Sequence, residues 1–364
     1  MGGGDRLRKA GRKLAVACAA VAIFVLLAEL GARLAESGPM SLYDSSPYAE
    51  DPTGVLPHVH RPDFRGRWDS TWYETNSRGW RGPEAPQAKP EGEFRIVALG
   101  DSCTFGKGVL EAETWPRVLE AELSRDLPEG RSVRVVNLGV NGYATRDYVR
   151  VFETVGAALQ PDLVILGYNI NDFPNPVRSA DNQVFHAAGD RGTLRARLRR
   201  WMGPTLRDEL NRLAIYRFAR ATYYDMSRQR DYAQMEAIAQ DKSSTEVEGL
   251  DQGFERETAV MRRLVDGAAA LDARVVIFLF PYESMVYLED SNRGPEERVL
   301  ELTAELNVPY VDVASAFRRE AHATQPPRQL FVRGDRYHPN PAGYRLTAET
   351  LAGSLRELAW VPGN

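Results

Sequence analysis

The chain has 364 residues, of which 43% are hydrophobic and 26% charged, and its formal net charge is −4. This size allows one large domain with extensions. The negative charge argues against a dedicated nucleic-acid-binding protein, whose binding domain is usually basic. Two cysteines, Cys18 and Cys103, provide neither a disulfide framework nor a Cys-rich zinc site.

Residues 1–35 combine a basic tail with an apolar segment. The basic residues precede an uncharged run from Leu14 to Ala28, and they are Arg6, Arg8, Lys9, Arg12 and Lys13. A weaker apolar continuation reaches Leu34, which brings the segment to about 30 Å as a helix. Positive charge before an apolar stretch keeps that end in the cytoplasm. We therefore predict a single-pass signal anchor in a bacterial-type cytoplasmic membrane, with the rest of the chain outside.

Two alternatives to this anchor stay open. Cleavable signal peptides have apolar cores of similar length, and after cleavage the chain would be secreted. The segment could also be a buried helix of a soluble protein. No clean cleavage site follows the apolar run, because Leu30-Gly31-Ala32 is a poor match to the small-residue pattern.

Residues 36–93 are rich in Pro, Gly, Ser, Trp and Tyr and show little helical periodicity. Residues 69–76 could pair as strands, and residues 76–83 have the composition of a turn. We expect a juxtamembrane extension packed on the main domain, with a plain linker as the alternative.

Alternating strands and helices begin at Phe94. Short apolar strands are predicted at 94–99, 134–138, 162–166, 274–280 and 308–311, with helices at 114–123, 145–158, 255–271, 295–306 and 341–358. Strands that are apolar throughout and alternate with helices indicate a parallel sheet covered on both faces. The main α/β domain is therefore expected over residues 94–360.

An insert at 173–254 interrupts this alternation. Its segment Arg191–Arg220 holds nine arginines and apolar residues at helical spacing. We interpret this segment as an amphipathic cap helix with a solvated basic face. A lid that faces anionic lipid or polysaccharide near the bilayer is the alternative.

Candidate site residues follow the predicted strands at their carboxyl ends. Ser102 comes after the first strand, Gly139 and Gly142 after the second, and Asn171 and Asp172 after the third. In an open parallel sheet these ends form the ligand-binding crevice. We therefore expect these loops to converge on one site, although they lie far apart in the sequence.

A histidine and a carboxylate precede the last predicted helix. A serine hydroxyl needs a base to take its proton, and that base is usually a histidine oriented by a carboxylate. The three-residue offset lets Asp335 reach the ring of His338 within one turn. Of the five histidines, only His338 has this arrangement in a loop that enters a helix. We predict Ser102 as nucleophile, His338 as base and Asp335 as the orienting carboxylate.

An oxyanion requires preorganised hydrogen-bond donors. The backbone N–H groups of Ser102 and Gly142 and the side-chain amide of Asn171 are the predicted donors. Glycine suits the second position because substrate must approach the backbone closely. Asp172 is expected to orient its loop without touching substrate.

These segments together resemble the SGNH (GDSL-type) hydrolases, a family of serine esterases and lipases. The resemblance covers Phe94 to about Leu358. It implies a flavodoxin-like three-layer α/β/α fold and assigns the four name-giving roles to Ser102, Gly142, Asn171 and His338. Asp335 completes the triad, and Asp101, beside the serine, has a supporting role.

Two departures from the family pattern matter. Cys103 follows Ser102, and we interpret it as a small buried residue and not as a second nucleophile. The third block runs from Gly167 to Asp172 and is longer than the usual Gly-x-Asn-Asp, so Asn169 is a lesser candidate for the amide donor. No Gly-x-Ser-x-Gly elbow surrounds Ser102, which disfavours the common α/β-hydrolase fold.

The predicted function is a membrane-anchored carboxyl-ester hydrolase that acts through an acyl-enzyme. One alternative is an O-acyltransferase or deacetylase that acts on cell-surface polysaccharide, and another is a non-catalytic binding protein on the same fold. No metal or cofactor is expected. The expected partners are an ester-bearing small molecule, lipid or glycan and, through the N-terminal helix, the membrane. The sequence leaves the oligomeric state open.

Overall fold

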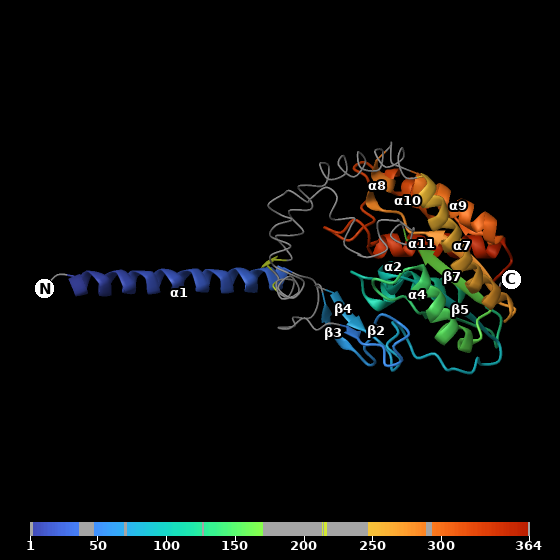
Figure 1. Cartoon of the computed structure of the whole chain (residues 1–364), viewed down its shortest axis with the longest axis horizontal. Coiled ribbons are helices and arrows are strands. Elements are labelled where there is room, and N and C mark those ends of the chain that lie inside the picture. Colours follow the sequence, from blue (N-terminus) through green and yellow to red (C-terminus); the bar gives the residue numbers. More distant parts are fainter. Residues whose placement is uncertain are drawn as a thin grey trace.

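The structure is a computed structural model that describes residues 3–35, 47–68, 71–125, 127–169, 213, 215–216, 247–288 and 293–362. Helix α1 (Gly3–Ala35) projects away from the main body (Figure 1). Among the described residues it is the one helix long and apolar enough to cross a membrane, over Ala15–Leu34. Its apolar side chains are exposed, as at Phe24 (71%). This length and composition fit both a membrane anchor and a signal sequence.

Among the described residues, the main domain contains a five-stranded parallel sheet in the order β6-β5-β7-β8-β9. The strands are β5 (Glu93–Gly100), β6 (Ser132–Asn137), β7 (Leu163–Tyr168), β8 (Arg274–Leu279) and β9 (Tyr310–Val311). In chain order this arrangement is 2-1-3-4-5, the doubly wound order whose connections diverge between its first and third strands. The ligand crevice of such a sheet therefore lies at the carboxyl ends of β5 and β7.

Helices cover both faces of the sheet, so the domain has the predicted three-layer α/β/α architecture. One face packs against α3 (Trp115–Leu123), α10 (Val313–His322) and α11 (Pro341–Glu357). The other packs against α4 (Thr145–Val151), α7 (Val247–Ala269) and α9 (Gly294–Leu306). Successive side chains of β5 alternate between these two cores because side chains on a strand point to opposite faces.

Several helices differ from the sequence prediction. The helix expected over 145–158 is α4 followed by a π turn at Phe152–Gly156 and a 3₁₀ turn at Ala157–Leu159. Helix α7 begins at Val247, inside the predicted insert. Helix α10 was not predicted, although Asp312 caps it by accepting a hydrogen bond from the Ser315 N–H at 2.9 Å. The short helices α2 (Ser102–Phe105) and α8 (Glu283–Tyr287) were also missed, because one or two turns carry too little periodicity to be recognised.

The extension before the main domain forms two antiparallel strand pairs, β1 (Tyr48–Ala49) with β2 (Val59–His60), and β3 (Arg65–Trp68) with β4 (Thr71–Glu74). Phe64 and Tyr73 form a small core with Phe105 of α2. The backbone of Arg81 forms an isolated antiparallel β-bridge with Asn137 at the end of β6. The extension thus packs beside the carboxyl ends of β5 and β6.

The predicted cap segment Arg191–Arg220 lies outside the described residues except for Leu213, Ile215 and Tyr216. The Ile215 N–H donates a hydrogen bond to the Glu29 carboxylate of α1 at 2.9 Å. The described part of this segment therefore lies beside the end of the apolar helix nearest the main domain (Figure 1).

Candidate active site

Ser102 is the first residue of α2, directly beyond the carboxyl end of β5. The Asp101 carboxylate caps this helix by accepting a hydrogen bond from the Cys103 N–H at 2.8 Å. Gly106 ends the helix in the left-handed conformation, with φ +86°. Ser102 is therefore placed on a single helical turn that is fixed at both ends.

His338 lies in the loop that enters α11. The Asn340 side chain caps α11 by accepting a hydrogen bond from the Gly343 N–H at 3.0 Å, and Pro341 occupies the first turn. Both residue types are favoured at these positions. The Val332 N–H donates to the His338 carbonyl at 2.9 Å. The helix cap and this backbone bond together fix the position of the histidine.

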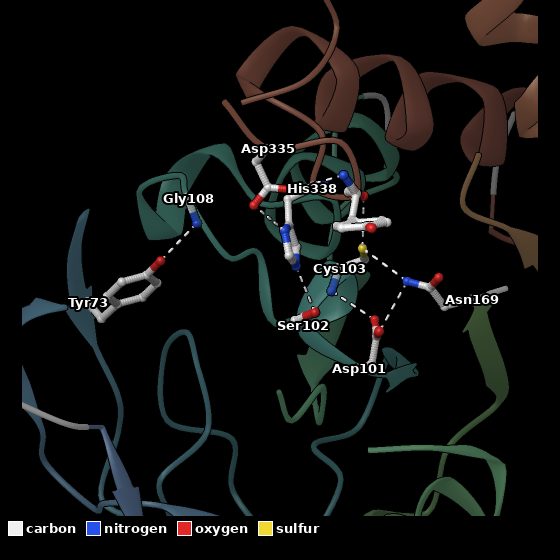
Figure 2. Close-up of polar contacts among 9 residues, drawn as sticks. Tyr73, Asp101, Ser102, Cys103, Gly108, Asn169, Asp335 and His338 are labelled. Carbon is white, nitrogen blue, oxygen red and sulfur yellow. Dashed lines mark hydrogen bonds and ion pairs between the residues drawn. The ribbon is translucent and has the colours of Figure 1, made fainter. Parts of the chain in front are cut away.

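Figure 2 shows Ser102, His338 and Asp335 in a continuous line of hydrogen bonds. The Ser102 Oγ lies 2.8 Å from His338 Nε2, and His338 Nδ1 lies 2.6 Å from Asp335 Oδ2. The second Asp335 oxygen accepts the backbone N–H groups of Tyr337 at 2.9 Å and His338 at 3.2 Å. Of the three side chains predicted to act together, His338 therefore lies within hydrogen-bond distance of both Ser102 and Asp335.

The environment of Asp335 favours its charged form. Burial by itself raises the pKa of the carboxyl, but the attraction and hydrogen bond of His338 and the charge of Lys107 outweigh it. The pKa of Asp335 is consequently held well below its usual range. An ionised Asp335 accepts the Nδ1–H of His338, which leaves Nε2 of the neutral ring free to accept the serine proton.

Asn169 is the first residue beyond β7 and lies next to the serine helix. Its side-chain nitrogen donates to Asp101 Oδ2 at 3.1 Å and lies 3.3 Å from the Cys103 sulfur (Figure 2). The Cys103 thiol also donates to the Tyr337 carbonyl at 3.4 Å. Cys103 is fully buried. Its contact with the Tyr337 carbonyl links α2 to the loop that contains His338, and the sequence alone did not reveal this link.

The loop that contains Gly142 follows β6 in the sequence and lies beside the carboxyl end of β5. The Val140 N–H donates to the carbonyl of Gly100 at 3.1 Å, two residues before Ser102. At Gly139 a Cβ would lie 2.4 Å from the Phe105 nitrogen, so this close approach requires glycine. Gly142 has φ +80°, in the region that favours glycine. Asn171 and Asp172, the other predicted residues, lie outside the described residues.

The extension contributes contacts to the loop after α2 that sequence reasoning missed. The Gly108 N–H donates to the Tyr73 hydroxyl at 2.8 Å (Figure 2). The Lys107 ammonium lies 5.3 Å from the centre of the Trp68 ring. The aromatic content of residues 36–93 was the available signal, but only the packing shows which loop these side chains support.

Within the described part of the chain, no group of three or more His, Cys, Asp or Glu side chains could hold a metal ion.

Comparison with known proteins places the chain in a family. Residues 98–346 match the model of the GDSL-like Lipase/Acylhydrolase family. No curated protein matches the chain.

Similar solved structures include LAE5, an alpha/beta hydrolase enzyme from the metagenome of Lake Arreo, Spain, with 20% identity over 71% of this chain and 94% of that chain, and a TM-score of 0.42. Axe2, an acetylxylan esterase from Geobacillus stearothermophilus, is 18% identical over 74% of this chain and 97% of that chain, with a TM-score of 0.42. The acetyl xylan esterase AlAXEase is 13% identical over 72% of this chain and 99% of that chain, with a TM-score of 0.43.

The family match spans more than half of the chain and includes Ser102, His338 and Asp335. The chain therefore belongs to the GDSL-like lipase/acylhydrolase family and is a carboxyl-ester hydrolase.

Proposed function

We propose that the chain hydrolyses carboxyl esters through an acyl-enzyme on Ser102, with His338 as general base and Asp335 as its orienting carboxylate. The observation that supports this role is the pair of hydrogen bonds from Ser102 Oγ to His338 Nε2 (2.8 Å) and from His338 Nδ1 to Asp335 (2.6 Å). A general base must lie within hydrogen-bond reach of the proton that it removes.

The reaction follows from this arrangement in two halves. His338 takes the Ser102 proton as the serine oxygen attacks the ester carbonyl, and it then protonates the leaving alcohol. Water, activated by His338, attacks the resulting acyl-enzyme and releases the acid. Asp335 stays ionised throughout and stabilises the charged imidazole.

The oxyanion formed in each half requires donors near Ser102. We propose the backbone N–H groups of Ser102 and Gly142 and one side-chain amide, with Asp101 and Asp172 in supporting positions. The block Asn171-Asp172 supports Asn171 as the amide donor. The position of Asn169, beside Asp101 at the end of β7, supports Asn169 as the competing candidate.

We further propose that α1 anchors the enzyme in the cytoplasmic membrane, with the catalytic domain on the outer side. The basic residues before the apolar segment support this orientation. Exposed apolar side chains over Ala15–Leu34 support burial of the helix in lipid, since a soluble surface rarely carries so long an apolar stretch. Cleavage as a signal peptide is the competing outcome.

The test is hydrolysis of p-nitrophenyl esters, from acetate to palmitate, by the full chain in detergent and by Ser102→Ala. We expect hydrolysis by the full chain and its abolition in the variant, and the chain-length optimum would then define the acyl pocket. Equal rates for folded wild type and variant across the series would overturn the proposed hydrolysis. Transfer of the acyl group to a glycan hydroxyl would then be measured with the same pair of proteins.

A further inference from the structure

We propose that His58, in the extension before the catalytic domain, is a positioning residue that holds the oxyanion-binding peptide in its productive orientation. The inference rests on the proposed function, in which the Gly142 N–H binds the oxyanion. His58 lies more than eighty positions from Gly142 in the sequence, and its ring is half-buried against the Gly142 loop.

Gly142 lies in a β-turn whose geometry is defined by two observations. The Tyr143 N–H donates to the Val140 carbonyl at 3.2 Å, which makes Asn141 and Gly142 the central residues. Gly142 has φ +80°, whereas Asn141 does not have a positive φ. A positive φ at the second central residue alone is the signature of a type II turn.

The central peptide of such a turn can point in either of two directions. Type I and type II turns differ mainly by a flip of the peptide that joins the two central residues. Here that peptide carries the Asn141 carbonyl on one side and the Gly142 N–H on the other, because a trans peptide directs the two groups oppositely. Glycine tolerates both orientations, so residue type alone does not hold the Gly142 N–H toward an oxyanion.

His58 contacts this same peptide unit. Its Nε2 lies 2.8 Å from the Asn141 carbonyl oxygen, and because a carbonyl only accepts, Nε2 carries the proton and donates. The nearest atom to a Cβ placed on Gly142 is the His58 Cε1, at 3.9 Å. A flip of the peptide would break this hydrogen bond, so His58 favours the type II orientation.

The ring of His58 is itself held in place. It packs edge-on against Tyr48 and Tyr143, with ring centres 5.1 and 5.3 Å apart. The Tyr143 hydroxyl donates to the His58 backbone carbonyl. The extension and the turn are therefore joined at two points, one through the His58 ring and one through its backbone.

No other polar side chain of the turn performs this task. The Asn141 side chain is buried, and neither of its amide atoms has a hydrogen-bond partner among the described residues. A hydrogen bond to the Asn141 carbonyl also polarises the peptide and strengthens the Gly142 N–H as a donor. His58 therefore acts on the reaction through Gly142, without touching substrate.

The experiment compares His58→Phe with His58→Gln in the full chain in detergent. Phenylalanine keeps the aromatic contacts and removes the donor, whereas glutamine keeps an N–H donor. His322→Phe is the matched control, because His322 Nε2 also bonds a backbone carbonyl, that of Val286 at 3.0 Å. Ser102-dependent hydrolysis of p-nitrophenyl acetate provides kcat and KM for each protein.

We expect His58→Phe to lower kcat about tenfold with little change in KM, a smaller effect than the roughly 100- to 1000-fold loss on deleting an oxyanion donor. His58→Gln should restore most of the rate, and His322→Phe should match wild type. In a Gly142→Ala background, where the Cβ has space but positive φ is disfavoured, His58→Phe should add little further loss. If His58 and Gly142 acted independently, the fold-losses in kcat of the two single variants would instead multiply in the double variant.

Crystal structures of wild type, His58→Phe and His58→Gln test the inference without using catalysis. We expect the Asn141 carbonyl to be rotated in His58→Phe and unchanged in His58→Gln. An unrotated carbonyl in His58→Phe, or a kcat equal to that of wild type, would overturn the inference. Should wild type lack Ser102-dependent hydrolysis, the proposed function would fail separately, and the carbonyl orientation alone would decide the role of His58.

Discussion

At the scale of single residues, the two oxygens of Asp335 have different partners. One lies 2.6 Å from the His338 ring nitrogen, and the other accepts backbone N–H groups of its own loop. Burial raises the pKa of Asp335, but His338 and Lys107 hold it well below its usual range. The carboxylate therefore stays ionised as the pH falls through the weakly acidic range.

Replacement of Asp335 by asparagine tests this assignment. An asparagine amide cannot hold His338 in the tautomer that leaves Nε2 free to accept, so we expect kcat to fall about 10³- to 10⁴-fold at neutral pH. The measurement is the pH profile of p-nitrophenyl acetate hydrolysis for wild type and Asp335→Asn. A variant within about tenfold of wild type would contradict a triad role.

The two candidate amide donors can be separated by substitution. We expect Asn171→Ala to lower kcat about 100- to 1000-fold with a small change in KM, because an oxyanion donor acts mainly in the transition state. Asn169→Ala should lower the melting temperature, since its buried amide bonds Asp101. If Asn169→Ala alone lost kcat while its melting temperature stayed unchanged, the donor role would belong to Asn169.

At the scale of elements, the extension stabilises the loop that follows the serine helix. The buried Arg81 guanidinium donates to the carbonyls of Phe105, Gly106 and Val109. It also lies over the Tyr73 and Phe105 rings, 4.7 and 4.9 Å from their centres. These contacts satisfy three backbone carbonyls in the segment that follows Ser102 in the sequence.

Removal of this cation should therefore destabilise the fold. Arg81→Met keeps much of the side-chain volume but leaves the carbonyls without a charged donor, and we expect a loss of about 3 kcal/mol in the free energy of unfolding. Arg78→Met is the matched control, because Arg78 is exposed and lies over the Trp80 ring at 5.1 Å. Urea unfolding of both variants measures the difference, and equal losses would contradict a special role for Arg81.

A buried histidine in the same element links stability to pH. His60 is 3% exposed and its ring lies 4.2 Å from that of Phe105. Burial, aided by the charges of His58 and Arg81, lowers the pKa of His60 from 6.5 to about 3. Between these values the unfolded chain binds a proton at His60 that the folded chain does not, so acidification favours unfolding.

We expect this histidine to destabilise the protein by about 2 kcal/mol at pH 5 relative to pH 7.5. His60→Phe should remove that part of the pH dependence, because the phenylalanine ring has no proton to bind. The free energy of unfolding of wild type and variant, measured at both pH values, provides the test. An identical pH dependence in the two proteins would show that His60 is not buried in its neutral form.

At the scale of the whole molecule, the apolar helix α1 precedes the α/β domain and projects away from it (Figure 1). Glu29 and Arg33 form an ion pair at 2.7 Å at the end of α1 nearest the domain. Glu29 also accepts the Ile215 N–H. The contact places Ile215 of the insert beside the last turns of the proposed membrane span.

A retained anchor predicts that the full chain stays with the membrane fraction after high salt and alkaline carbonate, with an intact mass that includes α1. Leu26→Arg combined with Leu27→Arg should abolish stable retention, since each charge near the centre of a span costs about 3 kcal/mol. The control is a Leu358→Arg variant, which alters an exposed leucine of the catalytic domain. A soluble product whose mass lacks α1 would instead show signal-peptide cleavage.

The sequence by itself determined the local parts of this protein. Apolar strands, turn glycines and the three-residue offset between Asp335 and His338 are short-range patterns, and each depends on backbone preferences within a few residues. The order of strands and helices then sufficed to predict a parallel sheet covered on both faces, and the resemblance to SGNH hydrolases implied its flavodoxin-like fold. In the folded chain the Ser102 Oγ lies 2.8 Å from His338 Nε2. The ends of α4 and α7 were less predictable because neighbouring packing, and not local pattern, decides where those helices begin and end.

The tertiary structure decided the contacts that have no local pattern. Nothing near His58 in the sequence indicates that its ring bonds the Asn141 carbonyl. Nothing near Arg81 indicates that its guanidinium bonds the Phe105 carbonyl. Those pairs form because burial removes water from polar groups, which must then find partners wherever the chain brings them. The partners are set by the packing of the extension against the sheet edge, and that packing depends on the whole fold.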